Sequence, residues 1–215
     1  MARKFTKKVR DKSFRKTKPV ILIIAEGTNE TETQYFYSFQ HQNAGYIIKV
    51  LCTGHKTDPE GMLNKIETYW NENGFDKERG DMAFVLVDLD YNEEKAKLIR
   101  RLEKKSAIAQ FIVSNPCFEV WFLLHFGYST KAFTSGNAVI DELKKHIPGY
   151  EKNMDVSGII LQGLADAIRN VQRLRQYHQD NGHLWPSKDC NPYSDADIVI
   201  QAIYSCKAMM EEKDE

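Results

Sequence analysis

The stretch MAFVLVDLD, residues 82–90, indicates the fold more directly than any other part of this 215-residue chain. Its first six residues are all apolar, which is the pattern of a strand buried on both faces, as in parallel sheets. Two acids, Asp88 and Asp90, close the run. Because residues two apart in an extended strand point the same way, we expect both carboxylates on one side and Leu89 in the core.

Similar apolar runs lie on both sides of this stretch, with helical patterns between them. Strands are predicted within residues 19–27, 46–52 and 107–114, and helices within residues 28–40, 58–70 and 92–105. Four strands that alternate with helices predict an α/β fold, with a Rossmann-like core built on a mostly parallel four-strand sheet flanked by helices.

The second half of the chain has a different pattern. An apolar helix is predicted after Asn115-Pro116, and amphipathic helices are predicted at residues 139–146, 158–179 and 194–210, with no strand among them. Residues 178–192 have the composition of a long loop, which is a common location for functional residues. We therefore divide the chain into a basic arm (1–18), an α/β core (19–130) and a helical extension packed on the core (131–215).

Charge is unevenly distributed although the formal net charge is zero. Residues 1–18 contain nine Lys or Arg and the single acid Asp11. Such an arm either binds phosphate backbones through counterion release or is a solvated tail. The candidate nucleic-acid-binding residues are Lys4, Lys7, Lys8, Arg10, Arg15, Lys16 and, in the long loop, Lys188.

Cysteine and hydropathy patterns exclude several protein classes. The four cysteines form no CxxC pair, so they predict neither a zinc ribbon nor a disulfide framework, and His41, His146, His178 and His183 show no ligand spacing. The longest early apolar run, Val20 to Ala25, is too short to cross a membrane, and no signal peptide is recognisable. We expect a cytoplasmic protein without membrane contact, and the sequence leaves a homo-oligomer open.

Acids at strand ends are the main candidates for chemistry. Ligands of open α/β sheets bind beyond the carboxyl ends of the strands, where Glu26, Asp88 and Asp90 are predicted to lie. Mg²⁺ prefers such oxygen ligands, and Mn²⁺ can substitute for it. We assign Asp88 and Asp90 to the metal and Glu26 to the metal or to general-base catalysis. The alternative is that each acid caps the helix after its strand.

Two further residues are candidates around this site. Glu30 lies one turn from Glu26 and could reach the metal through water, although the helix macrodipole alone favours acids such as Glu30 and Glu32 in a first turn. Lys56, in the loop after the second strand, could bind the scissile phosphate.

The apolar helix after Pro116 carries two more candidate catalytic residues. Burial of the Glu119 carboxylate requires a partner, which could be the metal, a basic side chain such as Lys188, or the cap of a neighbouring helix. His125 could donate to a phosphate or act as an acid, although a histidine at a helix end is more often structural.

Four motifs carry a resemblance to a known family. EGTNETETQYF (26–36) and VDLD (87–90) are similar to the two acidic motifs of Toprim domains, and SNPCFEVWFLLHF (114–126) with the late NPYS (191–194) is similar to the RloB-like family, in which Thr is expected where Ser194 stands. The resemblance covers about residues 18–204. It implies a Toprim-like core and a role in bacterial defence against phage, as in abortive infection, often with a partner ATPase.

The resemblance and the acids together favour one function and leave two alternatives. We expect a Mg²⁺-dependent nuclease that hydrolyses phosphodiester bonds of RNA, with tRNA one candidate, or of DNA. One alternative is a non-catalytic nucleic-acid-binding module that works with a partner ATPase. The other is a Toprim hydrolase of small phosphorylated substrates.

Overall fold

The computed structural model describes residues 18–26, 30–54 and 58–211 and builds them around a five-strand sheet. The strand order is β2-β1-β3-β4-β5, with β1 at Val20–Ala25, β2 at Ile47–Leu51, β3 at Met82–Asp88, β4 at Ala109–Asn115 and β5 at Tyr193–Ser194. The first four strands are parallel, which confirms the predicted α/β fold. The prediction of four strands was wrong, because β5 pairs antiparallel with β4 through Ser194 and Ser114.

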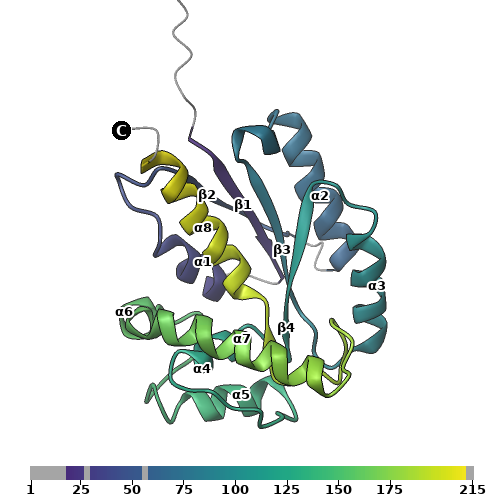
Figure 1. Ribbon diagram of the computed structural model, residues 1–215, viewed down its shortest axis with the longest axis vertical. Helices are drawn as coiled ribbons and strands as arrows, with labels where there is room; N and C mark the ends of the chain where they lie inside the picture. The colour runs from purple at the N-terminus through teal and green to yellow at the C-terminus, as the bar shows by residue number, and fades with distance from the viewer. Residues whose placement is uncertain (1–17, 27–29, 55–57, 212–215) are drawn as a thin grey trace, which may run out of the picture.

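Helices cover both faces of the sheet (Figure 1). On one face, α2 (Pro59–Glu72) and α3 (Glu93–Glu103) pack against alternate residues of the central strands, such as Leu22, Val85 and Val113. On the other face, α1 (Glu30–Tyr37) and α8 (Ala196–Glu211) pack against the intervening residues, such as Ile23 and Leu86. Burial of both faces explains why the strand sequences are continuously apolar.

The remaining helices gather beyond the carboxyl ends of the strands, in the lower part of Figure 1. They are α4 (Glu119–Leu124), α5 (Gly136–Leu143), the short α6 (Ser157–Ile160) and α7 (Leu164–Asp180), with a 3-10 turn at Leu161–Gly163. A second 3-10 turn, at Lys77–Arg79, precedes β3 at the opposite end of the strands. The start of α7 lies very close to the end of α4: a Cβ on Gly163 would be 2.4 Å from the carbonyl oxygen of His125. Only glycine fits this approach.

Local sequence signals set the starts of the helices that face the sheet. Asp58 accepts a hydrogen bond from the Gly61 amide (2.8 Å) at the start of α2, where Pro59 occupies the first turn. Asn92 accepts one from the Lys95 amide (3.0 Å) at the start of α3. These caps fix the first turn of each helix relative to the strand before it.

The outer border of β2 is covered by side chains. The Ile48 amide donates to the Gln40 side-chain carbonyl (2.7 Å), and the Val50 amide donates to the Tyr37 hydroxyl (3.3 Å). Two outward amides of this edge strand are therefore bonded although no further strand pairs with it in the described part of the chain.

Residues 131–211 share a core with the rest of the described chain. Val199, Ile200 and Ile203 of α8 are fully buried in the same apolar cluster as Ile21 and Leu86 of the sheet. The predicted helical extension and the α/β part thus pack around one continuous hydrophobic core. No helix within the described residues has the length and apolar character needed to cross a bilayer.

Candidate functional site

Five acids meet beyond the carboxyl ends of the parallel strands. They are Glu26 after β1, Glu32 in the first turn of α1, Asp88 at the end of β3, Asp90 in the following turn and Glu119 at the start of α4. We call these five residues the carboxylate cluster. Parallel strands carry these side chains from distant parts of the sequence to one edge of the sheet.

Asp88 and Asp90 do not lie on one extended strand as predicted. Strand β3 ends at Asp88, and Asp90 and Tyr91 have left-handed backbones with φ angles of 50° and 59°. Such values are uncommon for residues other than glycine and require support from the surroundings. The Asp90 amide donates to the Pro116 carbonyl (3.1 Å) and the Tyr91 amide to the Asn115 side chain (3.3 Å).

A turn therefore replaces the extended geometry at this site. Leu89 is fully buried, as expected, and Asp88 is partly buried, while the Asp90 side chain is 63% exposed. The end of β4 holds the turn in place, so two neighbouring strands together position the two acids.

Lys95 of α3 joins three parts of the site. Its ammonium group lies 2.8 and 3.1 Å from the two carboxylate oxygens of Glu26 and 2.6 Å from the Asp88 carbonyl oxygen. The Asp90 carboxylate is 3.9 Å away. The Lys95 ammonium therefore occupies the position at which a metal cation would neutralise Glu26 and Asp90. Since the Lys95 side chain is only 14% exposed, solvent screens these charges little.

Glu119 has the partner that its burial requires, and the partner is not Lys188. The Glu119 side chain is 3% exposed, with the Lys152 ammonium at 3.8 Å and the Tyr150 hydroxyl donating at 3.5 Å. Burial lowers the pKa of Lys152, but neighbouring acidic groups, Glu119 above all, outweigh it and leave that pKa raised. This pairing connects the start of α4 to the loop before α6.

Mutual repulsion in the cluster is visible in two pKa values. Burial, followed by the charges of Glu32, Glu119 and Asp90, raises the pKa of Asp88 well above its usual range. Burial and the charges of Glu119 and Glu26 raise the pKa of Glu32 to about 7. These two acids therefore hold their protons more tightly than usual, and an additional cation in the cluster would favour their ionised forms.

The donor set suits a hard divalent cation, since all five side chains offer carboxylate oxygens. Among the described residues, however, no three of these carboxylates have oxygen atoms within 4.8 Å of one another. Glu26 in particular is held by Lys95. The oxygen donors are of the type that Mg²⁺ prefers, but in the present arrangement they do not converge on one point, and Glu26 could join the others only if Lys95 released it.

Other predicted residues are not paired with the cluster or lie outside the described residues. Glu30 is exposed at the start of α1. Lys188 is paired with Asp189 (2.7 Å), and its backbone amide donates to Glu93 of α3. Lys56 and the basic residues of the arm, Lys4, Lys7, Lys8, Arg10, Arg15 and Lys16, lie outside the described residues.

His125 is placed in the core. It is 5% exposed, its Nδ1 donates to the Trp121 carbonyl (2.9 Å), and its Nε2 accepts from the Tyr35 hydroxyl (3.4 Å). Burial lowers the pKa of His125 to about 4, so the ring is neutral near pH 7. Both nitrogens have protein partners, and this placement supports the structural role over the catalytic one.

Three residues of the site were not predicted from the sequence. Glu32 could have been found because it lies in the first helical turn after the strand that ends before Glu26, but the macrodipole also explains an acid there. Lys95 and Lys152 carry no such signal, because lysines on a charged helix and in a loop are ordinary surface residues. Only the fold brings them to the acids.

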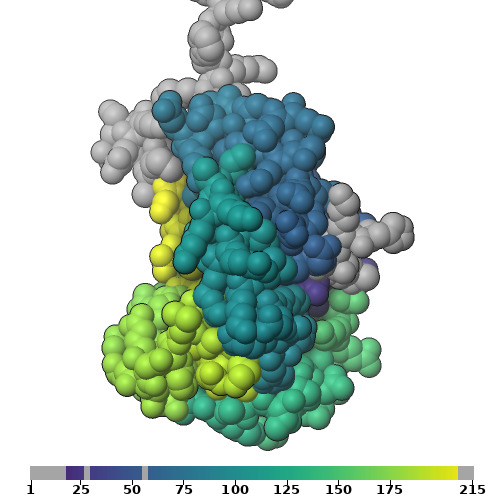
Figure 2. Space-filling view, turned by 90° about the vertical axis from the view of Figure 1, so that its right-hand side faces the viewer, coloured from purple at the N-terminus to yellow at the C-terminus, as the bar shows by residue number. Residues whose placement is uncertain are grey.

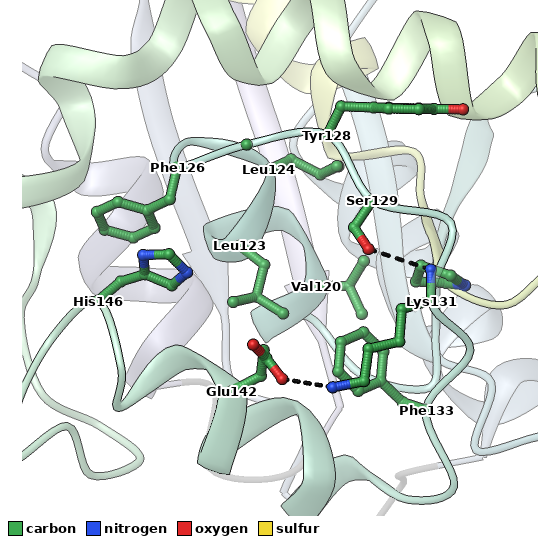
Figure 3. A pocket seen from close by; sticks show the side chains of 12 residues that line it. Val120, Leu123, Leu124, Phe126, Tyr128, Ser129, Lys131, Phe133, Glu142 and His146 are labelled. Atoms are coloured by element: carbon green, nitrogen blue, oxygen red, sulfur yellow. Dashed lines mark hydrogen bonds and ion pairs between the residues drawn. The ribbon is translucent and has the colours of Figure 1, made fainter.

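A separate apolar hollow of about 240 Å³ opens between α4, α5 and the loop after α4 (Figure 3). Val120, Leu123 and Phe133 form much of its wall, and Lys131 pairs with Glu142 at its rim. His146 stacks on Phe126 with the rings 10° from parallel. None of the carboxylate cluster lines this hollow, so we do not place the chemistry there.

Comparison with known proteins gives one match. A family model described as RloB-like protein matches residues 21–203, a range that includes every member of the carboxylate cluster. Neither the search of curated proteins nor that of solved structures gives a match.

Proposed function

Because this chain belongs to the RloB-like family, we propose that its carboxylate cluster binds Mg²⁺ and that the protein is a Mg²⁺-dependent nuclease with a Toprim-type site. One observation carries this proposal. Acids from the ends of two parallel strands and from two helix starts lie close enough that burial and repulsion raise the pKa values of Asp88 and Glu32. Perturbed carboxylates gathered at a strand edge are typical of functional sites.

Asp88 and Asp90 are the residues that we assign to the metal, and Glu26 would join them when Lys95 moves away. Bound Mg²⁺, or Mn²⁺ in its place, would neutralise the cluster and stabilise negative charge on the phosphate oxygens. Glu119 would remain paired with Lys152 and keep the start of α4 joined to the loop before α6.

Glu32 is our candidate general base. A carboxylate whose pKa is about 7 is partly ionised at neutral pH and can accept a proton from water. In hydrolysis, the water oxygen would bond to phosphorus, its proton would pass to Glu32, and the phosphorus–oxygen bond to the leaving nucleotide would break as that oxygen takes a proton from solvent water. This role was not predicted from the sequence, which assigned the base to Glu26.

The substrate that we propose is RNA, with tRNA one candidate, or DNA, bound in part by the basic arm. From the family resemblance we also propose a defensive role against phage together with a partner ATPase. Such a partner would act on the carboxylate cluster by freeing Glu26 from Lys95.

One observation favours a second candidate function. The Lys95 contact and the separation of the carboxylates are also what a non-catalytic nucleic-acid-binding module would show, since it needs no metal. The two functions differ in whether Mg²⁺ binds.

Asp88→Asn tests the proposal. We expect cleavage of labelled tRNA, single-stranded RNA or duplex DNA to require Mg²⁺ or Mn²⁺ and to fall by roughly a hundredfold or more in this variant, because the charge stabilisation from a metal amounts to several kcal/mol. Asp141→Asn, which removes an exposed acid of α5, is the matched control and should retain activity. Circular dichroism checks that each variant is folded.

Calorimetric titration with Mg²⁺ separates the two functions. Lys95→Met should bind Mg²⁺ more tightly than the wild type, since the Glu26 oxygens lose their competing cation. Full cleavage by Asp88→Asn would contradict the metal assignment. Nucleic-acid binding without Mg²⁺ binding or cleavage would support the binding module instead.

A further inference from the structure

His178, His183 and Cys190 come together in the loop region between α7 and β5. One ligand atom from each lies within 4.8 Å of the other two, and among the described residues this is the one group of three or more His, Cys, Asp or Glu side chains to do so. His178 belongs to the last turn of α7, His183 follows the helix, and Cys190 precedes β5. Each is thus brought in by a different segment.

The geometry points to a zinc site formed by His178, His183 and Cys190. Two imidazole nitrogens and a thiolate are typical zinc ligands and poor ligands for Mg²⁺, which prefers oxygen. The two Nδ1 atoms are 3.0 Å apart. Tetrahedral zinc with Zn–N bonds of about 2.05 Å places two nitrogens about 3.3 Å apart, so a small ring movement is sufficient.

The tautomer of His178 is already suitable for metal binding. Its Nε2 donates to the Pro192 carbonyl (2.9 Å), which leaves the Nδ1 lone pair directed at His183. Metal-bound histidines usually have such a carbonyl or carboxylate partner at the second nitrogen. Binding of Zn²⁺ would release the Cys190 thiol proton to solvent, while the His183 proton would move from Nδ1 to Nε2.

Burial gives the site a closed side and an open side. His178 is 3% exposed and Cys190 is fully buried, whereas His183 is partly exposed. The Cys190 sulfur otherwise has only two long contacts of 3.7 Å, with the Ser187 hydroxyl and the Leu184 carbonyl. A hydrogen bond between His178 and His183 explains why their Nδ1 atoms lie close together. It does not explain why the Cys190 sulfur lies beside them. Water would complete the coordination from the exposed side.

Zinc at this position would fix a loop that is joined through Asn115 to the turn that carries Asp90. Asn115 donates to the carbonyls of Cys190 (2.6 Å) and Lys188 (3.3 Å), while its side-chain oxygen accepts from Tyr91 in the turn that carries Asp90. On the other side, the Arg100 guanidinium donates to the Pro186 carbonyl. Figure 2 shows the yellow-green surface of this loop beside the blue surface of α3.

Zinc content of the full chain, purified without a histidine tag, tests the inference. We expect one zinc per chain by mass spectrometry and transfer of that zinc to a colorimetric chelator only at high chelator concentration. Cys190→Ser and His183→Ala should each weaken zinc binding at least about tenfold. The matched controls are Cys52→Ser and His41→Ala, which change an exposed cysteine and an exposed histidine and should retain zinc.

Cobalt substitution gives a second measurement that does not depend on nuclease activity. The wild type should show a thiolate-to-cobalt charge-transfer band that Cys190→Ser lacks. Because Cys190 is buried, its variant could unfold, and the partly exposed His183→Ala keeps the test decisive. A chain that binds no zinc, or variants that bind it as well as the wild type, would overturn the inference and leave a histidine pair with a buried thiol. Neither result bears on Mg²⁺ binding by the carboxylate cluster.

Discussion

The ammonium group of Lys95 links Glu26 and Asp90 of the carboxylate cluster to the start of α3. Asn92 caps α3 at the Lys95 amide, so the first helical turn fixes the base of the side chain. The ammonium then contacts Glu26, which follows β1, and the carbonyl of Asp88 in β3. One lysine thereby connects a helix start with two strand ends, and its release would change the charge of the whole site.

His125→Asn tests the buried neutral histidine. The amide nitrogen can still donate to Trp121, but loss of the ring contacts should cost about 2 kcal/mol of unfolding free energy near pH 7. The folded pKa is about 4, and the unfolded value is about 6.5. Stability from this group is therefore present above about pH 6.5 and is lost as the pH falls towards 4, by roughly 3 kcal/mol in total.

Urea unfolding at several pH values between about 8 and 5 measures this effect. The wild type should lose stability on acidification more steeply than His125→Asn, so the two curves should converge. Parallel curves would show that His125 is not held neutral in the folded protein.

The sequence predicts the strongest ligand candidates but not their surroundings. Glu26, Asp88 and Asp90 follow apolar runs, so strand order alone brings them to one edge. Glu32, Lys95 and Lys152 acquire their roles through contacts between segments that are distant in the sequence, and no periodic pattern records such contacts. His178, His183 and Cys190 are likewise brought together by the ends of α7 and β5.

Among the elements, the junction between α4 and α7 is the most sensitive to a small change. Gly163→Ala would place a Cβ 2.4 Å from the His125 carbonyl oxygen, which is backbone and cannot rotate away. We expect a loss of about 1–3 kcal/mol in unfolding free energy, as for other overpacked positions. Urea denaturation measures it.

Gly158→Ala is the matched control for this junction. A Cβ on Gly158 meets no atom within 4 Å, and the substitution reduces the freedom of the unfolded chain, so stability should be unchanged or slightly higher. Equal effects of the two substitutions would contradict the close approach of α7 to α4.

At the level of elements, the long helices and buried strands were predictable and the short pieces were not. The apolar runs that became β1, β3 and β4 match their predicted positions because both faces are buried. Strand β5 has two residues, follows Pro192 and pairs only with the end of β4, so no alternation could reveal it. The predicted helix at residues 158–179 begins at Leu164, after the short α6 and a 3-10 turn.

For the whole molecule, the shared core predicts that the α/β half does not fold alone. Removal of residues 131–215 deletes β5 and exposes the sheet face covered by Val199, Ile200 and Ile203. Burial of each side chain contributes about 1.5–3 kcal/mol, so the three together approach the total stability of an ordinary domain. The fragment of residues 1–130 should show no cooperative urea transition by near-ultraviolet circular dichroism, whereas the full chain should show one. A cooperative transition in the fragment would identify two independent folding units.

Each border of the sheet is partly covered, and this has a consequence for self-association. Exposed strand edges can template the addition of a strand from another molecule, which leads to polymers. Here β5 covers the end of β4, while Gln40 and Tyr37 accept the outward amides of Ile48 and Val50 on β2. Copies that meet at the β2 border find its hydrogen-bond donors already satisfied, so the protein resists edge-to-edge polymerisation even when it is crowded.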